Sequence, residues 1–120
     1  MREDSPTQFI RFKRKRGVYE RGLELVVQVQ AALDQAKVRH YLKDRLDRGV
    51  TAVVMAIAQA DTELPSQRWR PYRRALELAN QVRVELDIII AHGEVDLRVT
   101  RASVTARKLC EELVRLASGR

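Results

Sequence analysis

Apolar residues recur at intervals of three and four in four separate segments of the chain, and this periodicity limits the possible folds more than any other feature. The first segment, 18–37, carries one stripe made of Tyr19, Leu23, Val26, Gln30 and Leu33. A second stripe with similar spacing is made of Leu25, Val29, Ala32 and Ala36. Residues three and four apart share one face of a helix, so this segment is predicted to be an amphipathic helix with two faces available for burial.

Three further helical segments follow, separated by residues that interrupt helices. The second segment spans 39–60. The third begins near Arg70, with Pro71 in its first turn, and stops at Gly93. The fourth begins at about Asp96, a residue type favoured at helix N-caps. The expected core positions of these segments are Leu42, Leu46, Val50, Val53, Val54 and Ile57, then Tyr72, Leu76, Ala79, Val82, Leu86, Ile89 and Ile90, then Val99, Ala102 or Ser103, Ala106, Leu109, Leu113 and Leu116.

Four such helices joined by short connections pack most simply as antiparallel neighbours. A chain of 120 residues, 45% of them hydrophobic, suits a single core, and the scarcity of proline, glycine and aromatic residues favours helices over strands. We therefore predict an all-α fold, an antiparallel up-down-up-down four-helix bundle over 17–118. A basic N-terminal tail, 1–16, precedes it and is expected to be mobile.

The charge of the chain points to an acidic partner. Lys and Arg outnumber Asp and Glu by 23 to 16, a formal net charge of +7, which favours nucleic acid. Two clusters are predicted to bind RNA or DNA. The first, in the tail, comprises Arg11, Lys13, Arg14, Lys15 and Arg16, and the second comprises Arg68, Trp69, Arg70, Arg73 and Arg74.

Each cluster also has a purely structural interpretation. The tail interleaves Phe9 and Phe12 with its cations, so its rings could stack on exposed bases. The same tail could instead only raise solubility, or pack on its own bundle or on a neighbour. In the second cluster, Trp69 and Tyr72 could cap the end of the bundle while the arginines are solvated.

No set of residues points to catalysis, a metal or a cofactor. His40 and His92 stand alone, without the spacing of metal ligands. Cys110 is the single cysteine, so no intrachain disulfide can form, and this favours a cytoplasmic location. Its side chain is expected to act as a small hydrophobe. There is no glycine-rich phosphate loop, GxSxG or HExxH, and no apolar run is long enough to span a membrane. We therefore expect a protein that is not an enzyme.

Three stretches of the chain resemble a known family. They are Tyr19-Glu20-Arg21-Gly22-Leu23-Glu24-Leu25-Val26, Arg45-Leu46-Asp47-Arg48-Gly49-Val50, and Ala75-Leu76-Glu77-Leu78-Ala79-Asn80-Gln81-Val82-Arg83-Val84-Glu85-Leu86. Together they resemble the four-helix-bundle proteins encoded in intervening sequences of bacterial large-subunit ribosomal RNA genes, and the related accessory variability proteins of diversity-generating retroelements. One departure is Ala56-Ile57-Ala58-Gln59-Ala60, where the first branch usually has Asn-Ile-Ala-Glu-Gly.

The resemblance implies a ring-like homopentamer with no catalytic activity. The retroelement branch further implies binding to nucleic acid and to a reverse transcriptase. The apolar positions outside the main core face agree with an oligomer, because a monomer would leave them exposed. The predicted oligomer interface comprises Leu25, Val29, Ala32, Ala36, Val84 and Ile88.

Two functional hypotheses are carried forward, and a third, an enzyme with no recognised motif, is kept only as a remainder. The first is a homo-oligomeric bundle that binds nucleic acid through its basic surfaces. The second is a structural or protein-interaction bundle, such as a scaffold or adaptor for a partner protein, whose charge is incidental. We also expect Arg48 and Glu85 to be partly buried and to pair across the bundle, because a buried charge must be paired.

Overall fold

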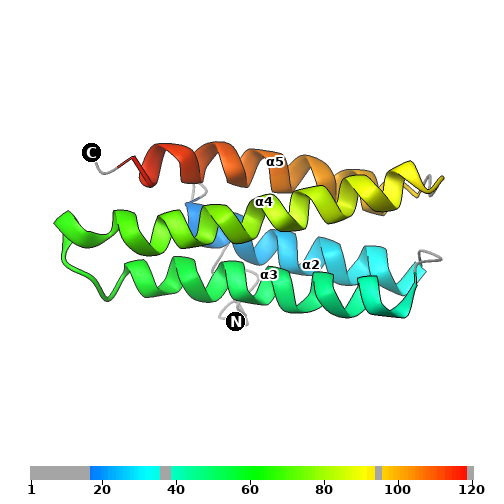
Figure 1. The fold of residues 1–120 in the computed structure, drawn as a ribbon, viewed down its shortest axis with the longest axis horizontal. Coiled ribbons are helices and arrows are strands. Elements are labelled where there is room, and N and C mark those ends of the chain that lie inside the picture. The colour runs from blue at the N-terminus through cyan, green and yellow to red at the C-terminus, as the bar shows by residue number, and fades with distance from the viewer. Residues whose placement is uncertain (1–16, 36–38, 94–95, 119–120) are drawn as a thin grey trace, which may run out of the picture.

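The computed structural model describes residues 17–35, 39–93 and 96–118, and within these ranges the chain forms long helices and no strand. The helices are α2 (Val18–Gln35), α3 (His40–Ala60), α4 (Trp69–Ala91) and α5 (Leu97–Leu116), with a short 3-10 turn, η1 (Pro65–Gln67), between α3 and α4. They run antiparallel to their neighbours (Figure 1). The predicted all-α four-helix bundle is therefore confirmed. The tail 1–16 lies outside the described residues.

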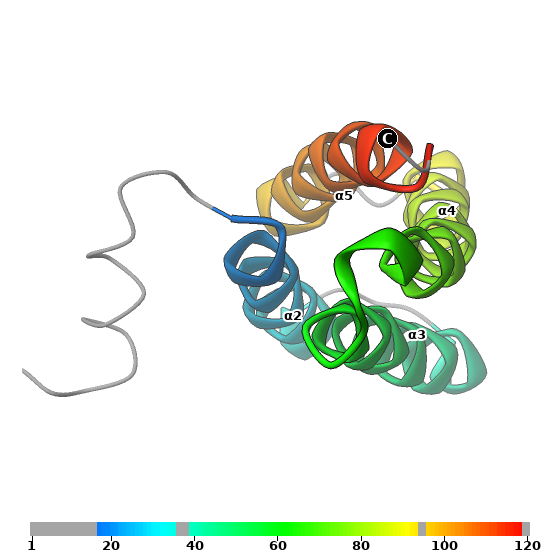
Figure 2. The same ribbon diagram turned by 90° about the vertical axis from the view of Figure 1, so that its left-hand side faces the viewer.

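Each helix packs against two others, as the view along the bundle shows (Figure 2). The neighbouring pairs are α2 with α3, α3 with α4, α4 with α5, and α5 with α2, so α3 lies diagonally opposite α5. The first and last helices of the bundle are thus side by side. An ion pair from Arg21 Nε to Glu112 Oε1, 2.6 Å long, joins them.

The helix boundaries follow the local signals of the sequence. Gly93 has φ of +97°, a left-handed conformation that ends α4 at little cost because glycine has no Cβ. The backbone N–H of Arg98 donates a 2.7 Å hydrogen bond to the side chain of Asp96, the predicted N-cap of α5. Pro71 lies in the first turn of α4, where its missing N–H leaves no helix bond unmade.

The core is one cluster that draws on all four helices. Its largest fully buried side chains include Leu25, Leu46, Ile57, Leu86, Leu109 and Leu113. Most predicted core positions of α3, α4 and α5 are buried, while Tyr72 and Leu76 are partly buried against the cluster. Ile90 and Leu116, also predicted for the core, lie exposed in the last turns of their helices.

The assignment of the two stripes of α2 was wrong. Leu25, Val29 and Ala32 are at most 1% exposed and belong to the core of the protomer, so they cannot form an oligomer interface. Of the other stripe, Leu33 is buried, but Tyr19 and Gln30 are exposed. The second stripe of α2 therefore faces the core, because it is the side of α2 that lies between its two neighbours, α3 and α5. Ala36 lies outside the described residues.

Candidate nucleic-acid interface

Four arginines gather where the chain enters α4. Arg70, Arg73 and Arg74 are exposed within the first two turns of α4, and the guanidinium of Arg70 lies over the ring of Trp69, 5.5 Å from its centroid. Arg74 has one acidic partner, Glu77, at 3.7 Å on the exposed surface, a separation that gives little binding energy. These three cations are therefore available to phosphate groups.

Arg68 and the aromatic residues of this cluster also have structural roles. Arg68 is half-buried, and its Nε donates a 3.3 Å hydrogen bond to the carbonyl oxygen of Glu63, which braces the connection between α3 and α4. Trp69 is half-buried. Tyr72 packs against the core, and burial, together with the nearby Asp61, raises the pKa of its hydroxyl. The predicted site thus divides into an exposed set of three arginines and a structural set.

The start of α2 lies beside the end of α3. The predicted tail cluster, Arg11, Lys13, Arg14, Lys15 and Arg16, lies outside the described residues, which begin at Gly17. A Cβ on Gly22, in the second turn of α2, would lie 3.3 Å from Val54 and 3.4 Å from Ile57, so the start of α2 packs against the end of α3. A connection over residues 61–68 leads from that end to the start of α4 (Figure 1). The start of α2 and the start of α4 therefore lie in the same half of the bundle.

Several other arginines are held in ion pairs. Arg107 contacts Asp87 at 3.2 Å and links α5 to α4, while Arg83 contacts the same carboxylate at 3.6 Å. Arg21 is taken up by its pair with Glu112. Four exposed cations on α5, at positions 98, 101, 108 and 115, show no such pairing among the described residues. The last three were not predicted from the sequence, although their spacing of seven was a visible signal.

The predicted pair between Arg48 and Glu85 was wrong in one partner. Glu85 is buried, as expected, but its Oε2 lies 3.3 Å from Nε of Arg45. Arg48 is 72% exposed and pairs with Asp44 at 2.7 Å along its own helix. Arg45 and Arg48 are three residues apart, about 60° around the helix, and the rotation of α3 places Arg45 beside α4.

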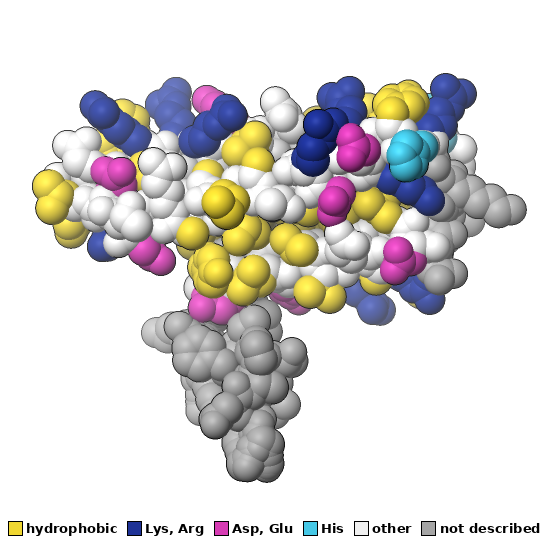
Figure 3. Space-filling view, turned by 90° about the horizontal axis from the view of Figure 1, so that it is seen from below, with side chains coloured by type: hydrophobic (Ala, Val, Ile, Leu, Met, Phe, Trp, Pro, Cys, Tyr) yellow, Lys and Arg dark blue, Asp and Glu magenta, His cyan; other side chains and the backbone are white. Residues whose placement is uncertain are grey.

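Apolar side chains remain exposed on the outside of the bundle. Val84 is 44% and Ile88 is 40% exposed, which leaves these two predicted interface residues accessible. They help to line a pocket of about 300 Å³ beside Glu85 and Arg45. Hydrophobic side chains also gather on the face formed by α2 and α3 (Figure 3), two helices whose exposed hydrophobic residues include Val27 and Met55.

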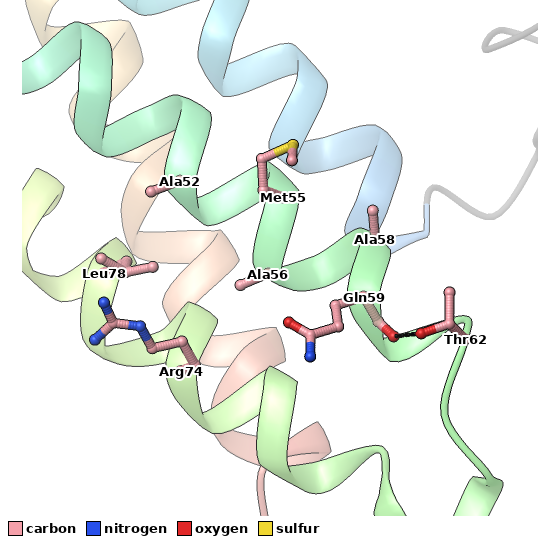
Figure 4. A pocket seen from close by; sticks show the side chains of 8 residues that line it. All are labelled: Ala52, Met55, Ala56, Ala58, Gln59, Thr62, Arg74 and Leu78. Carbon is pink, nitrogen blue, oxygen red and sulfur yellow. Dashed lines mark hydrogen bonds between the residues drawn. The ribbon is translucent and has the colours of Figure 1, made fainter.

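A larger open pocket, about 700 Å³, lies between the second half of α3 and the start of α4 (Figure 4). Small and apolar side chains form most of its lining, with Arg74 and Gln59 among the polar groups. The described lining residues are Ala52, Met55, Ala56, Ala58, Gln59, Thr62, Arg74 and Leu78. These residues include no carboxylate, thiol or imidazole, so the pocket is suited to contact with an apolar surface and offers no acid–base pair.

Potential catalytic groups are few among the described residues. No three His, Cys, Asp or Glu side chains come together there in a way that could hold a metal ion. Cys110 is buried, and burial raises the pKa of its thiol more than Arg83 and Arg107 lower it, which leaves it a poor nucleophile at neutral pH. None of the described helices combines the length and the apolar character needed to cross a bilayer.

Comparison of the chain with known proteins found no matching family model, no matching curated protein and no matching solved structure.

Proposed function

We propose that this protein is a non-enzymatic, homo-oligomeric helix bundle that binds nucleic acid through the basic surface at one end of the bundle. One observation carries the proposal: Arg70, Arg73 and Arg74 are exposed together within the first two turns of α4. The five predicted contacts of the tail, which precedes α2 in the sequence, are proposed to add to this surface. Phosphates are neutralised by such groups, whereas most other arginines described above are engaged in ion pairs. The binding is expected to show little sequence preference, because contacts to phosphates carry no sequence information directly.

Fluorescence anisotropy with labelled RNA and DNA across a salt series tests this proposal. If the cations neutralise phosphates, log affinity falls linearly with log salt, by about 0.9 per contact on duplex DNA and about 0.7 on single strands. Replacement of Arg70, Arg73 and Arg74 by Gln lowers affinity and makes the salt dependence shallower. Replacement of the five tail cations does the same.

A matched control separates position from net charge. Arg39, Lys43 and Arg48 lie on or next to α3. Replacing them by Gln lowers the net charge by three, as the replacement of Arg70, Arg73 and Arg74 does. This control is expected to retain most of the affinity. If it loses as much affinity as the Arg70, Arg73 and Arg74 variant, or if the unaltered protein does not bind at low salt, the proposal is wrong.

The oligomer is part of the proposal and rests on the exposed apolar residues of α4. Val84 and Ile88 would be covered in a closed ring, and a pentamer is the state that the family resemblance implies. Several basic ends on one particle would hold a long strand at once, so long nucleic acids should bind more tightly than short ones. If the chain is of the retroelement branch, a reverse transcriptase is a further proposed partner.

The second candidate is a scaffold or adaptor without nucleic-acid binding. The pocket between α3 and α4 favours it, because its apolar lining can receive a side chain of a partner protein. This candidate becomes the better account if the anisotropy series shows no binding.

A further inference from the structure

A row of positive charges runs along the outer surface of α5. Arg101, Lys108 and Arg115 are all exposed and are seven residues apart. Seven residues are close to two full helical turns, so the three side chains leave the helix on nearly the same side, at intervals of about 10 Å. The row is therefore about 21 Å long and nearly straight.

The acidic groups around this row are largely committed elsewhere. Glu112 of α5 pairs with Arg21 of α2, and Asp87 of α4 pairs with Arg107. No ion pair of the described residues includes a member of the row. Glu111, the other acidic residue between Lys108 and Arg115 along the chain, is exposed. The three exposed cations of the row repel one another, and a bound polyanion would relieve this repulsion.

The row leads toward the basic end of the bundle. Arg115 is in the last turn of α5, and α5 ends on the side of the molecule where α4 begins (Figure 1). The exposed Arg70 and Arg73 are in the first turns of α4. The row and these arginines therefore lie toward the same end of the bundle.

We infer that a double-stranded nucleic acid lies lengthwise along α5, with its phosphates on Arg101, Lys108 and Arg115. The inference rests on the proposed function and specifies the class of nucleic acid and its path. A straight, rigid row matches a stiff duplex, whose persistence length is about 50 nm. Proteins that bind single strands use aromatic side chains as stacking platforms, and α5 has no aromatic residue in its sequence.

The direct test compares two triple variants of the full chain on one probe. Arg101→Gln, Lys108→Gln and Arg115→Gln remove the row while keeping good helix formers. The control is Arg39→Gln, Lys43→Gln and Arg48→Gln, with the same change in net charge on the α3 side, diagonally opposite α5. The probe is a fluorescein-labelled 14-base-pair DNA duplex, about 48 Å long, which exceeds the length of α5 (about 30 Å) but limits bridging between copies.

In the row variant, the plot of log affinity against log salt should become less steep: the magnitude of its slope falls by about 2.7, at about 0.9 per lost phosphate contact. Binding at 0.1 M salt should weaken at least about tenfold. The control variant should keep the slope. Glu111→Gln should act in the opposite direction and strengthen binding about threefold, because it removes a negative charge beside the path. This single exposed change also serves as the test if circular dichroism shows that the row variant does not fold.

The results separate this inference from the proposed function. If the row variant and the control bind the duplex equally, or if Glu111→Gln does not strengthen binding, the duplex does not follow α5, and the inference is overturned. The proposed function survives that result if the Arg70, Arg73 and Arg74 variant still loses affinity. If the unaltered protein binds neither this duplex nor single-stranded RNA or DNA at low salt, both fail. A row variant that weakens binding only to a 14-nucleotide single strand overturns the assignment to duplexes.

Discussion

Glu85 shows how a single buried charge is accommodated in this bundle. Its side chain is 12% exposed, and Arg45, which is 61% exposed, approaches it from α3 at 3.3 Å. Burial raises the pKa of the Glu85 carboxyl, and the charge and hydrogen bond of Arg45 lower it by less. The net pKa is raised, so the ionised carboxylate is less favourable in the folded protein than in the unfolded chain.

This environment predicts that Glu85→Gln changes the pH dependence of stability. A carboxyl whose pKa is raised by folding binds its proton more tightly in the folded state, so its contribution to stability is present below the unfolded pKa and is lost as pH rises through the folded pKa. The gain in unfolding free energy from Glu85→Gln should therefore be larger at pH 7 than at pH 4. Urea unfolding at the two pH values measures it, with the exposed Glu77→Gln as control. An equal effect at both pH values would contradict the raised pKa.

At the scale of the helix, α2 is the element that sequence periodicity could not orient. Its two stripes have the same spacing and similar apolar content, and the start of one is about 120° from the start of the other around the helix. Which stripe faces inward depends on the side chains of the neighbouring helices. At Gly22 the absence of a side chain lets Val54 and Ile57 of α3 approach closely. The other side of this contact belongs to α3, so the sequence of α2 alone does not reveal it. The same limit applies to Arg45 and Arg48, because only the rotation of α3 decides which one reaches Glu85.

The corrected orientation predicts that Val29→Glu unfolds the bundle. Val29 is 0% exposed, so the new carboxylate would be buried without a partner, at a cost of at least about 3 kcal/mol of unfolding free energy. Val27→Glu is the matched control, since Val27 is 67% exposed on the same helix and should change stability by less than about 0.5 kcal/mol. Chemical denaturation followed by circular dichroism measures both. A folded Val29→Glu protein that has only lost its assembly would restore the original interface assignment.

For the whole molecule, the sequence predicts the fold class and the approximate ends of every helix, because breakers, caps and the 3.6-residue period act locally. Helix α5 begins after its N-cap Asp96, and α4 ends before Gly93, where these signals placed the two boundaries. Surfaces were harder to predict. The pocket lined by Ala52 and Leu78 and the row on α5 depend on how whole helices pack, and the tail and Ala36 lie outside the described residues.

The exposed apolar residues of α4 lead to a prediction about assembly. Val84→Asp combined with Ile88→Asp places two charges where the proposed interface would bury them, so subunit affinity should fall more than about tenfold. The control is Val114→Asp, a comparable change at a 56% exposed position on α5. Analytical ultracentrifugation over a concentration series distinguishes the assembled state from the monomer. Sedimentation as a monomer by the unaltered protein, or an unchanged assembly of the double variant, would contradict the proposed interface.

The contact between α2 and α5 also bears on the order in which the chain can fold during its synthesis. Helix α2 packs along one side against α5, which is the last helix of the bundle to leave the ribosome. The Arg21–Glu112 pair between them joins positions 91 residues apart. At roughly 5–20 residues per second, α2 waits about 5–20 s for that partner. A nascent chain that already holds α2, α3 and α4 thus still exposes the faces of α2 and α4 that α5 will cover. A bundle of this topology is consequently most open to chaperones, and to wrong pairing with neighbouring nascent chains, just before α5 emerges from the ribosome.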